Sequence, residues 1–555
     1  MTAPRPFDAI VLGAGAGGLS AACAAAARGL KTLLLEKTPW VGGTAAISGG
    51  MVWIPGNAKM PAAGLSDSEA AARAYLGATL SAGSKPELVD AFLRHGPDAV
   101  DWFEARTQLK LKPVVRYPDY YPSLPGATLG GRVLEPVGYD ARGLGEAFSL
   151  LRSPLPEFTL FGGMMIDRAD LPHFRAVTRS PRSMLRVARL LLRHAGERLS
   201  APRGTSLVLG NALVARLLRS ALDLGVEIRT RVDVAGLLRG ERGVEGVELR
   251  DGTKLLVSRG VVLACGGFSH DAERRPRWLP EGTDAASPVC EGNTGDGLRL
   301  GESAGGRVPE GNLHNAYWAP LSRFRRPDGS PAVFPHTVAD RGKPGIIAVN
   351  AKGERFTSEA VSYHEFGLAM FRAKAIPAFL LCDSKSLWQY GLGGVRPFTR
   401  RLERFVEQGY LVSAATPAEL AAKLGIDAAG LARTIATYNA DAISGVDTQF
   451  NLGGDDYQRF LGDRAHGPNP CMRALESAPF HAVRLHPSDL GTAAGLETDA
   501  EARVLDREGK PVSGLYACGN DMNSIMGGAY PGPGITLGPA LVFGWLAARH
   551  LAARA

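Results

Sequence analysis

Three glycines near the start of the chain, Gly13, Gly15 and Gly18, have the spacing that lets a backbone bind the pyrophosphate of a dinucleotide. The first glycine permits a tight turn, the second lets the phosphates approach the backbone, and the third lets a helix pack closely on a sheet. Glu36 follows about 20 residues later, where an acidic side chain accepts hydrogen bonds from a ribose hydroxyl. The pattern predicts a dinucleotide site near the N-terminus.

A strand, a helix and a second strand are needed to position these residues. The short apolar run 8–13 predicts a buried strand, 19–28 an alanine-rich helix, and 30–36 a second strand. Glycines that follow a strand and open a helix within a βαβ unit are far more specific than the glycine pattern alone. The helix N-terminus also favours the phosphate charge. This context favours a dinucleotide site over a glycine-rich turn without a ligand.

Length and composition limit the class of protein. A chain of 555 residues with 45% hydrophobic content can bury a large core, which excludes a disordered chain and predicts two domains. The sequence contains no uncharged apolar stretch long enough to span a bilayer. Its six cysteines lie far apart without metal-ligand spacing, so we expect a reduced cytoplasmic compartment, no disulfide and no metal site. No zinc-finger spacing accompanies the net charge of +8, so we expect no nucleic-acid partner.

Further glycine-rich segments indicate which dinucleotide binds. A strand that runs into Gly519 is followed by the segment 527–538 and by an alanine-rich helix over 539–553, and the strand 260–267 ends in paired glycines. Together these segments resemble the FAD contacts of the flavoprotein family that includes fumarate reductase, succinate dehydrogenase and the 3-ketosteroid dehydrogenases. The resemblance implies an α/β fold, in which a Rossmann-like FAD-binding domain is built from both ends of the chain.

The same resemblance implies a set of FAD contacts. The segment 42–50 would lie under the isoalloxazine ring, where small residues let the backbone approach, and it holds no histidine for a covalent link, so FAD is expected to bind non-covalently. The implied contacts are Gly13, Gly15, Gly17, Gly18, Glu36, Lys37, Gly42, Gly43, Thr44, Ser48, Gly49, Gly50, Ala264, Gly266, Gly267, Gly519, Asn520, Gly534, Thr536 and Leu537.

Segments elsewhere indicate the branch of the family. The segments 116–121, 354–367 and 530–534 resemble those of the 3-ketosteroid Δ1-dehydrogenases, and 293–297 and 488–492 extend the match from about residue 8 to the last helix. The resemblance implies a steroid as the small-molecule substrate. It also implies an electron acceptor that the sequence does not identify, for which a quinone is one candidate. No clear second nucleotide fingerprint is present, so NAD(P)H is not expected as a direct partner.

The resemblance assigns catalytic roles to four residues. The hydroxyl of Tyr530 and the backbone N–H of Gly534 would hold the C3 ketone oxygen and stabilise the developing enolate. Tyr363 would take the C2 proton while the C1 hydrogen leaves as hydride to flavin N5. A hydrogen bond from Tyr120 would stabilise the Tyr363 phenolate. His364 remains an alternative base by ordinary pKa.

Alternatives remain for one role and for the reaction as a whole. Tyr117 and Tyr121 are close rivals of Tyr120, and Tyr121 points the other way if the segment is extended. Two other reactions are considered, dehydrogenation of a 3-ketosteroid at C4–C5 and reduction of an enoate or dicarboxylate of the fumarate type. The Tyr530-to-Gly534 pattern favours Δ1-dehydrogenation over the C4–C5 reaction. It also argues against a dicarboxylate reductase, because it occupies the place where we would expect the polar or basic substrate clamp of such an enzyme.

Domain boundaries follow from this organisation. Residues 1–310 and 484–555 are predicted to form the FAD-binding domain, and 311–483 an inserted α+β substrate domain with the flavin in the cleft between them. The segment 416–438 predicts two short helices. Residues 152–203 are interpreted as a basic helical insertion, with ten arginines, no lysine and four acidic residues for a net charge of +6.

Within this insertion, 182–199 predicts a basic amphipathic helix. Its arginines at helical spacing are Arg182, Arg186, Arg189 and Arg193, and its apolar line is Leu185, Ala188, Leu192 and Leu199. One interpretation places this helix on an anionic membrane surface, with the protein in the cytoplasm and peripheral on the inner face of the membrane. The other is a solvated helix packed on its own protein.

Overall fold

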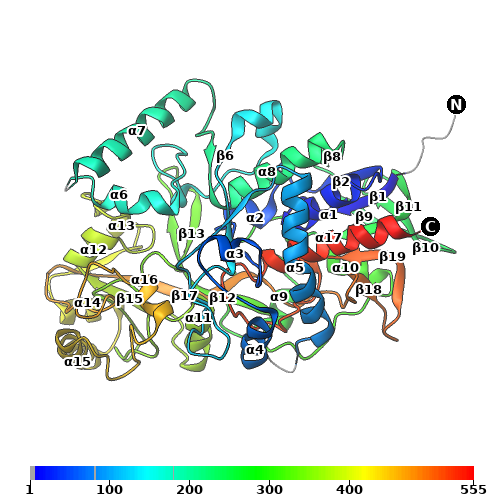
Figure 1. Cartoon of the computed structure of the whole chain (residues 1–555). Helices are drawn as coiled ribbons and strands as arrows, with labels where there is room; N and C mark the ends of the chain where they lie inside the picture. The colour runs from blue at the N-terminus through cyan, green and yellow to red at the C-terminus, as the bar shows by residue number, and fades with distance from the viewer. Residues whose placement is uncertain (1–6, 81–82, 179, 555) are drawn as a thin grey trace.

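In the computed structural model of the chain, which describes residues 7–80, 83–178 and 180–554, strand β1 (Phe7–Leu12) lies within a large mixed sheet (Figure 1). The strands are ordered β18 (Arg503–Leu505), β19 (Pro511–Ala517), β11 (Lys254–Leu263), β1, β2 (Thr32–Glu36) and β8 (Glu227–Thr230). β1 runs parallel to β2 and β11, and Ile10 lies opposite both Leu33 and Val261. Because β11 also runs parallel to β19, the sheet confirms the predicted α/β fold drawn from both ends of the chain.

Two helices from opposite ends of the chain pack closely on each other. The hydroxyl of Ser20 on α1 (Ala16–Ala26) donates to the carbonyl oxygen of Leu541 on α17 (Leu537–Ala553) at 2.6 Å. A Cβ atom on Gly544 would lie 2.7 Å from the carbonyl oxygen of Gly17, so only glycine fits this contact. The alanine and glycine content of both helices follows from this close approach. α1 begins earlier than predicted because Gly15 is its N-cap.

Smaller elements surround the large sheet. β9 (Val234–Gly240) and β10 (Gly243–Leu249) form a hairpin on β11, and β3 (Val52–Trp53), β5 (Val133–Pro136) and β4 (Leu111–Pro113) form a separate antiparallel sheet. β6 (Tyr139–Asp140) pairs with β7 (Ser206–Leu207). The helices of this part of the chain are α2 (Gly43–Ile47), α3 (Lys59–Ala62), α4 (Glu69–Thr79), α5 (Pro86–Arg106), α8 (Leu209–Asp223), α9 (Arg274–Trp278) and α10 (Asp296–Ser303), with 3₁₀ segments at Ala141–Leu150, Pro156–Phe158, Arg168–Asp170 and Gly519–Asp521.

A second, antiparallel sheet carries the middle of the chain. Its order is β13 (Pro331–Pro335), β12 (Ala316–Arg325), β17 (Phe480–Thr492), β15 (Ala378–Asp383) and β14 (Ile346–Val349), with β16 (Val412–Ala414) also on β17. The helices around it are α11 (Tyr363–Arg372), α12 (Ser384–Tyr390), α13 (Glu403–Glu407), α14 (Pro417–Leu424), α15 (Ala428–Ser444) and α16 (Asp456–Leu461). The long strand β17 runs through position 483, where the sequence placed a domain boundary.

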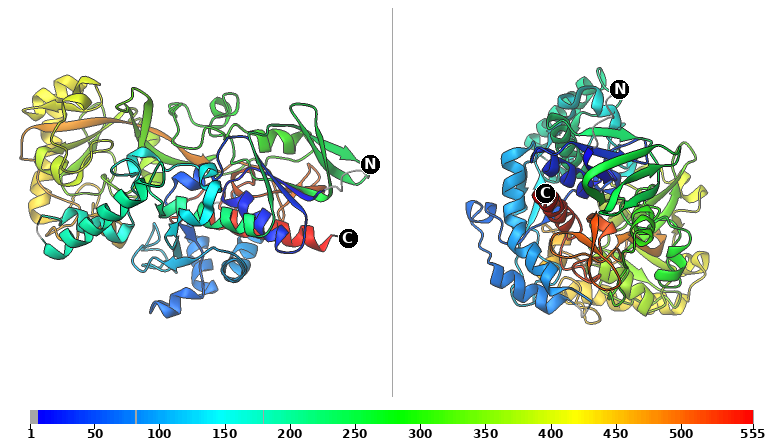
Figure 2. Two further views of the ribbon diagram at one scale, coloured as in Figure 1. Left: turned by 90° about the horizontal axis from the view of Figure 1, so that it is seen from above. Right: turned by 90° about the vertical axis from the view of Figure 1, so that its right-hand side faces the viewer.

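The predicted basic helix is α7 (Pro181–Arg198), which follows α6 (Leu171–Arg175) and lies at the periphery of the molecule (Figures 1 and 2). The face that packs on the protein consists of Ser183, Val187, Leu190 and His194. The predicted apolar line is mostly on the outside, since Leu185, Leu192 and Leu199 are 53%, 73% and 90% exposed. Among the residues that the structure describes, no helix combines the length and apolar character needed to cross a bilayer.

Candidate active site

The predicted dinucleotide loop surrounds an open space at the N-terminus of α1. Gly13 has a φ of +98°, and a Cβ atom there would collide with the carbonyl oxygen of Ala264. By contrast, a Cβ on Gly15 would meet no heavy atom within 4 Å, and one on Gly43 would meet only the Cα of Gly15 at 3.7 Å. Gly519, from the C-terminal part of the chain, also faces open space, because a Cβ atom added there would meet only the Cβ of Ala540 at 4.0 Å. These glycines therefore leave room beside the helix N-terminus for a bound group.

Glu36 and Lys37 end the second strand of this unit, and both already have protein partners. The carboxylate of Glu36 accepts from the backbone N–H groups of Ala14 at 2.9 Å and Thr38 at 2.7 Å. Lys37 Nζ lies 2.6 Å from a carboxylate oxygen of Asp296. Each oxygen of an ionised carboxylate has a further lone pair, so Glu36 can still accept a ribose hydroxyl.

The segment 42–50 turns tightly beside this loop. Gly42, Gly43 and Gly50 have positive φ angles of +123°, +49° and +66°, which other residues rarely adopt. Thr44 Oγ1 accepts from the backbone N–H of Cys290 at 3.1 Å, and Ser48 Oγ accepts from the N–H of Gly50 at 3.0 Å. The Ser48 hydroxyl thus fixes a turn of the segment, and the Thr44 hydroxyl ties the segment to the loop that contains Cys290.

A buried aspartate, Asp521, joins the C-terminal part of the chain to the end of β11 at the predicted FAD contacts, and sequence reasoning missed it. One carboxylate oxygen of Asp521 accepts from the N–H of Gly267 at 2.9 Å and the other from that of Cys265. Burial raises the pKa of Asp521 to about 6. The side chain fixes the Gly519–Asn520 turn against the end of β11, beside Ala264 and Gly266. A small hollow there is lined by Asn520, Thr536 and Tyr317.

Three tyrosines that lie far apart in the sequence meet in the interior. The hydroxyl of Tyr363 donates to that of Tyr530 at 2.9 Å. The ring of Tyr120 stacks on Tyr530 with centroids 5.6 Å apart and meets Tyr363 edge-on at 5.7 Å. All three are buried, and the Tyr120 hydroxyl has no hydrogen-bond partner among the described residues. We refer to these three tyrosines, together with the neighbouring Tyr457, as the phenol cluster.

Local structure explains how each phenol is held. Ser362 caps α11 by accepting from the N–H of Glu365 at 3.2 Å, so Tyr363 is the first residue of that helix. The N–H of Tyr120 donates to the carbonyl oxygen of Pro531 at 3.1 Å, which ties the two segments together. Asp119, buried next to Tyr120, accepts from Trp53 Nε1 at 2.8 Å and from Arg132 Nη1 at 2.8 Å.

Gly534 lies close to Tyr530 and exposes a backbone donor. Its φ is +94°, and a Cβ atom there would lie 2.6 Å from the carbonyl oxygen of Met51, so glycine is required. Its carbonyl accepts from Trp53 N at 3.2 Å and from Gly538 N at 2.8 Å. Its own N–H has no acceptor among the described residues. A hydroxyl and an unpaired N–H from one short segment can together bind a carbonyl oxygen.

The structure distinguishes Tyr120 from Tyr121, whereas Tyr117 lies near the cluster as well. The Tyr121 hydroxyl donates to Glu365 Oε1 at 2.8 Å, away from the cluster. The Tyr117 ring packs on Phe460 with centroids 4.5 Å apart and lies 6.5 Å from the Tyr457 ring, and its phenol helps to raise the pKa values of Tyr120 and Tyr530. Tyr120 is favoured because its ring contacts both Tyr363 and Tyr530.

Two further tyrosines reach the site from segments that carry no motif. Tyr457, on α16, is buried with its ring 4.8 Å from that of Tyr120 and with no hydroxyl partner among the described residues. Tyr317, on β12, meets Tyr530 edge-on at 5.1 Å and donates to Ser524 Oγ at 2.8 Å. No sequence signal marked either residue, because their proximity depends on tertiary packing alone.

Burial keeps the phenols protonated and His364 neutral. The pKa of Tyr530 is raised to about 12, and those of Tyr363 and Tyr120 are raised well above the usual value. Burial lowers the pKa of His364 to about 3. His364 Nδ1 also accepts from the backbone N–H of Trp318 at 3.1 Å, so its lone pair is occupied. Of the two candidate bases, the geometry favours Tyr363.

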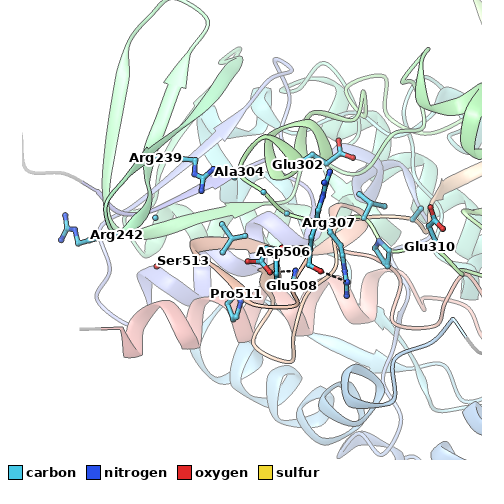
Figure 3. A pocket seen from close by; sticks show the side chains of 18 of the residues that line it. Arg239, Arg242, Glu302, Ala304, Arg307, Glu310, Asp506, Glu508, Pro511 and Ser513 are labelled. Atoms are coloured by element: carbon cyan, nitrogen blue, oxygen red, sulfur yellow. Dashed lines mark hydrogen bonds between the residues drawn. The ribbon is translucent and has the colours of Figure 1, made fainter.

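A larger hollow, of about 1580 Å³, lies elsewhere on the protein (Figure 3). Side chains of both charges line it, among them Arg239, Arg307, Glu302 and Asp506. It lies beside the β9–β10 hairpin, and no member of the phenol cluster lines it. The chemistry of the tyrosines is therefore separate from this groove.

Comparison with known proteins identifies the family of the chain and its relatives. The family described as FAD binding domain matches residues 8–537. The chain is 38% identical to 4-oxocyclohex-2-ene-1-carboxylate 5-dehydrogenase from Sinomonas cyclohexanicum, over 98% of this chain and 93% of that protein. It is 35% identical to a 3-oxosteroid 1-dehydrogenase from Mycobacterium tuberculosis, over 99% of both chains. The crystal structure of 3-ketosteroid Δ1-dehydrogenase from Sterolibacterium denitrificans, in complex with 1,4-androstadiene-3,17-dione, superposes with a TM-score of 0.92, 37% identity and 99% coverage of both chains.

Proposed function

The chain belongs to the FAD binding domain family, and from this premise we propose that it is an FAD-dependent dehydrogenase that introduces a C1–C2 double bond into ring A of 3-ketosteroids. Two observations carry the proposal: the buried hydrogen bond between Tyr363 and Tyr530, and the unpaired N–H of Gly534 on the same short segment as Tyr530. The full-length relatives named 3-oxosteroid 1-dehydrogenase support the substrate.

FAD is the cofactor, and the residues of the cradle fit it. Open space in front of Gly15, Gly43 and Gly519 suits a pyrophosphate at the N-terminus of α1, and Glu36 retains the capacity to accept from a ribose. Gly49 and Gly50, beside Met51, would let the backbone approach the isoalloxazine ring. Among the described residues of 42–50 there is no histidine, so we propose non-covalent binding.

In this proposal the residues of the chain divide the work of removing two hydrogens. Tyr530 and Gly534 hold the C3 ketone oxygen and stabilise the negative charge that develops as C2 loses its proton. Tyr363 acts as the base in its ionised form: the phenolate oxygen receives that proton and becomes the neutral hydroxyl, and Tyr120 lies beside it to stabilise the phenolate before the transfer. Bound FAD supplies the acceptor for the hydride from C1. The products are the C1–C2 alkene, reduced cofactor and a proton on the protein.

A second candidate substrate is a 4-oxocyclohexene carboxylate. The 38% identical relative acts on such a compound by its name, and the chemistry beside the ketone is the same. A carboxylate substrate needs a cation with free donors. Arg168 lies near the site, 5.2 Å over the Tyr117 ring; it is 3.5 Å from a carboxylate oxygen of Glu135, and its Nε has no hydrogen-bond acceptor among the described residues. The aromatic surroundings of the cluster favour the steroid.

Measuring turnover of each candidate substrate with an artificial electron acceptor shows which of the two the enzyme prefers. We expect kcat/KM for androst-4-ene-3,17-dione to exceed that for 4-oxocyclohexanecarboxylate, with the new double bond at C1–C2 of the steroid. A higher kcat/KM for the carboxylate would overturn the steroid assignment and leave the dehydrogenase chemistry intact. A product desaturated at C4–C5 from a saturated ketosteroid would instead favour the other steroid reaction.

Replacing Gly15 with alanine tests the cofactor cradle. The backbone of Gly15 is extended and the added Cβ meets no protein atom within 4 Å, so the variant is expected to fold. The methyl group would occupy space that the pyrophosphate needs, and such overpacking typically costs about 1–3 kcal/mol, which weakens FAD binding roughly 10- to 100-fold. FAD content after dialysis measures the effect.

The matched control is Gly77→Ala in α4, where an added Cβ also meets nothing within 4 Å. It should keep its FAD. Full FAD retention in Gly15→Ala would remove this loop from the cofactor site.

We also propose that α7 rests on an anionic membrane surface, which would bring the enzyme close to dissolved steroids and to a quinone as electron acceptor. Its exposed side carries Leu185, Leu192 and Leu199 together with Met184, which is 58% exposed. Arg182 and Arg189 are also exposed, whereas Arg186 pairs with Asp170 at 2.8 Å. An apolar line flanked by cations is suited to the interface of a bilayer.

Removing two of these cations tests the surface. Each basic residue near an anionic bilayer contributes about 1 kcal/mol, so the pair Arg182→Gln and Arg189→Gln should weaken sedimentation with anionic vesicles by about 2 kcal/mol, roughly thirtyfold. Exposed arginines on the distant β9–β10 hairpin, Arg239→Gln with Arg242→Gln, provide the control. No sedimentation of the unmodified protein at low salt would contradict the proposal.

A further inference from the structure

Arg341, in the loop between β13 and β14, is buried to 1% exposure and is bound by backbone carbonyl groups alone. Its Nη1 donates to the carbonyl oxygens of Glu359 at 2.8 Å and Val361 at 3.2 Å. Its Nη2 and Nε donate to those of Thr337 at 2.8 Å and His336 at 2.5 Å. Neutral dipoles therefore solvate the guanidinium, while its positive charge remains.

The nearby carboxylates are turned toward other partners. Asp340 accepts from His336 Nδ1 at 2.7 Å and from the N–H of Gly393 at 2.9 Å, and its contact with Arg341 is to the backbone N–H at 2.9 Å rather than to the guanidinium. Glu359 binds Arg355 at 2.7 Å, and Asp447 binds the same arginine at 2.9 Å. Among the described residues no carboxylate lies within ion-pair distance of the Arg341 guanidinium. A buried cation without an ion pair is strongly unfavourable unless a negative charge is available to it.

Two kinds of group provide negative charge near Arg341: the carboxylates of Asp340 and Glu359, which lie beyond ion-pair distance, and the phenols when they ionise. A phenolate at Tyr457 or Tyr120 interacts favourably with Arg341, and the guanidinium lowers the pKa of Tyr457 against the opposing effect of burial. Tyr457 in turn packs against Tyr120 at 4.8 Å, and Tyr120 against Tyr363 at 5.7 Å. Arg341 thus stands at one side of a continuous group of buried hydroxyls.

Arg341 also fixes the backbone that leads into the base. Its contacts at Glu359 and Val361 lie just before Tyr363, and its guanidinium lies 4.9 Å over the ring of Phe366 on the same helix. The position of Tyr363 at the first turn of α11 therefore depends on the same side chain that supplies the charge.

We propose that Arg341 is a positioning residue for the dehydrogenation, which holds the Tyr363 end of α11 and supplies the positive charge that stabilises a phenolate in the phenol cluster. The inference rests on the proposed function in one respect, the role of Tyr363 as the base. No step of the reaction takes place on Arg341 itself.

Other titratable groups face the cluster from the elements packed around it. Tyr117 lies on the segment of Tyr120, Tyr317 on β12, and His364 and Glu365 on α11. His364 is held neutral by burial, and Glu365 is bonded to Tyr121. The other nearby cations are already paired, Arg168 with Glu135 at 3.5 Å and Arg132 with Asp67 at 2.7 Å and Asp119 at 2.8 Å. Removal of the Arg341 charge should therefore act first on the pKa of Tyr457, and through the packed phenols on the rest of the cluster.

The experiment compares Arg341→Met with Arg341→Lys in the FAD-loaded enzyme. Two quantities are followed against pH, the ultraviolet absorbance of tyrosinate in the resting protein and the rate of flavin reduction by androst-4-ene-3,17-dione. Loss of the charge in Arg341→Met should move both profiles to higher pH by about one unit or more, which slows reduction at neutral pH about tenfold per unit. Arg341→Lys keeps the charge and should restore most of this shift, even where it lowers thermal stability.

Arg216→Met is the matched control, because Arg216 also donates to three backbone carbonyls, those of Val137, Gln108 and Gly138, and it lies over the ring of Tyr139, which is outside the phenol cluster. It should leave the rate profile unchanged and alter the tyrosinate profile only through Tyr139. Equal shifts in Arg341→Met and Arg341→Lys, or unshifted profiles in a folded Arg341→Met, would overturn the inference. If Arg341→Met fails to fold, Arg341→Lys decides alone, since a profile shifted by a unit or more despite the retained charge contradicts the proposal. If the proposed function itself is wrong, the result is different: Arg341→Met still shifts the tyrosinate profile, but the ketosteroid does not reduce the flavin even in the unmodified enzyme.

Discussion

Replacing Tyr363 with phenylalanine is expected to slow flavin reduction by a 3-ketosteroid about 10²- to 10⁴-fold while FAD stays bound. The phenylalanine ring fills the same buried space, so the loss reports the hydroxyl rather than packing. Without it the C2 proton has no acceptor, and the occupied Nδ1 of His364 cannot replace it. Stopped-flow measurement of flavin absorbance gives the rate directly.

The pH dependence of the unmodified enzyme follows from the same residue. Burial raises the pKa of Tyr363 well above its usual value, so at neutral pH only a small fraction of the phenol is ionised. As long as the pH is below the pKa, each rise of one pH unit increases the ionised fraction tenfold. The rate of flavin reduction should therefore rise with pH and level off only in the alkaline range. Tyr363→Phe should lose this rise.

Two variants serve as controls for Tyr363→Phe. Tyr438→Phe removes another buried hydroxyl that lacks a partner, in a different core, and should react at the normal rate. His364→Gln should lose less than tenfold if Tyr363 is the base. A Tyr363→Phe enzyme that keeps its full rate, or a His364→Gln enzyme that loses more, would transfer the role of base to His364.

Replacing Tyr530 with phenylalanine is the second change with a large expected effect. It removes a donor from the proposed oxyanion site, and loss of one such donor typically raises the barrier by about 2.7–4 kcal/mol, or about 10²- to 10³-fold in rate. It also deprives Tyr363 of its hydrogen bond at 2.9 Å. The Gly534 N–H remains, so a residual rate should persist.

The two effects of Tyr530→Phe can be separated. Loss of the oxyanion donor slows the reaction at every pH, whereas loss of the Tyr363 contact moves the pH profile. Substrate affinity should change less than the rate constant, because the donor acts most strongly on the charge that develops in the transition state. A variant with a normal rate and weaker binding alone would assign Tyr530 to substrate binding.

Much of the fold could be predicted because local patterns agree with the tertiary structure. The apolar runs that end in glycines became β1, β11 and β19, and the alanine-rich segment after Gly538 became α17. The same small residues that signal these helices allow α1 and α17 to touch. The family resemblance, the α/β fold and FAD are confirmed by the comparisons.

What could not be predicted depends on contacts between distant segments. Tyr457 and Arg341 lie in stretches without a motif, and only the packing of α16 and of the β13–β14 loop brings them to the phenols. Asp521 follows a recognised glycine turn, but its role appears only when the end of β11 lies beside it. The sequence also does not show which face of α7 packs on the protein. Val187 and Leu190 lie on the buried face, whereas Leu192 of the predicted apolar line is exposed.

One anaerobic experiment tests both the proposed reaction and the role of Tyr363 in it. FAD-loaded enzyme is mixed with one equivalent of androst-4-ene-3,17-dione while flavin absorbance is followed, and the steroid is then identified. We expect the flavin to bleach, 1,4-androstadiene-3,17-dione to form in matching amount, and the flavin of Tyr363→Phe to bleach far more slowly. Flavin that stays oxidised with the steroid, or bleaches equally fast in Tyr363→Phe, would contradict this expectation.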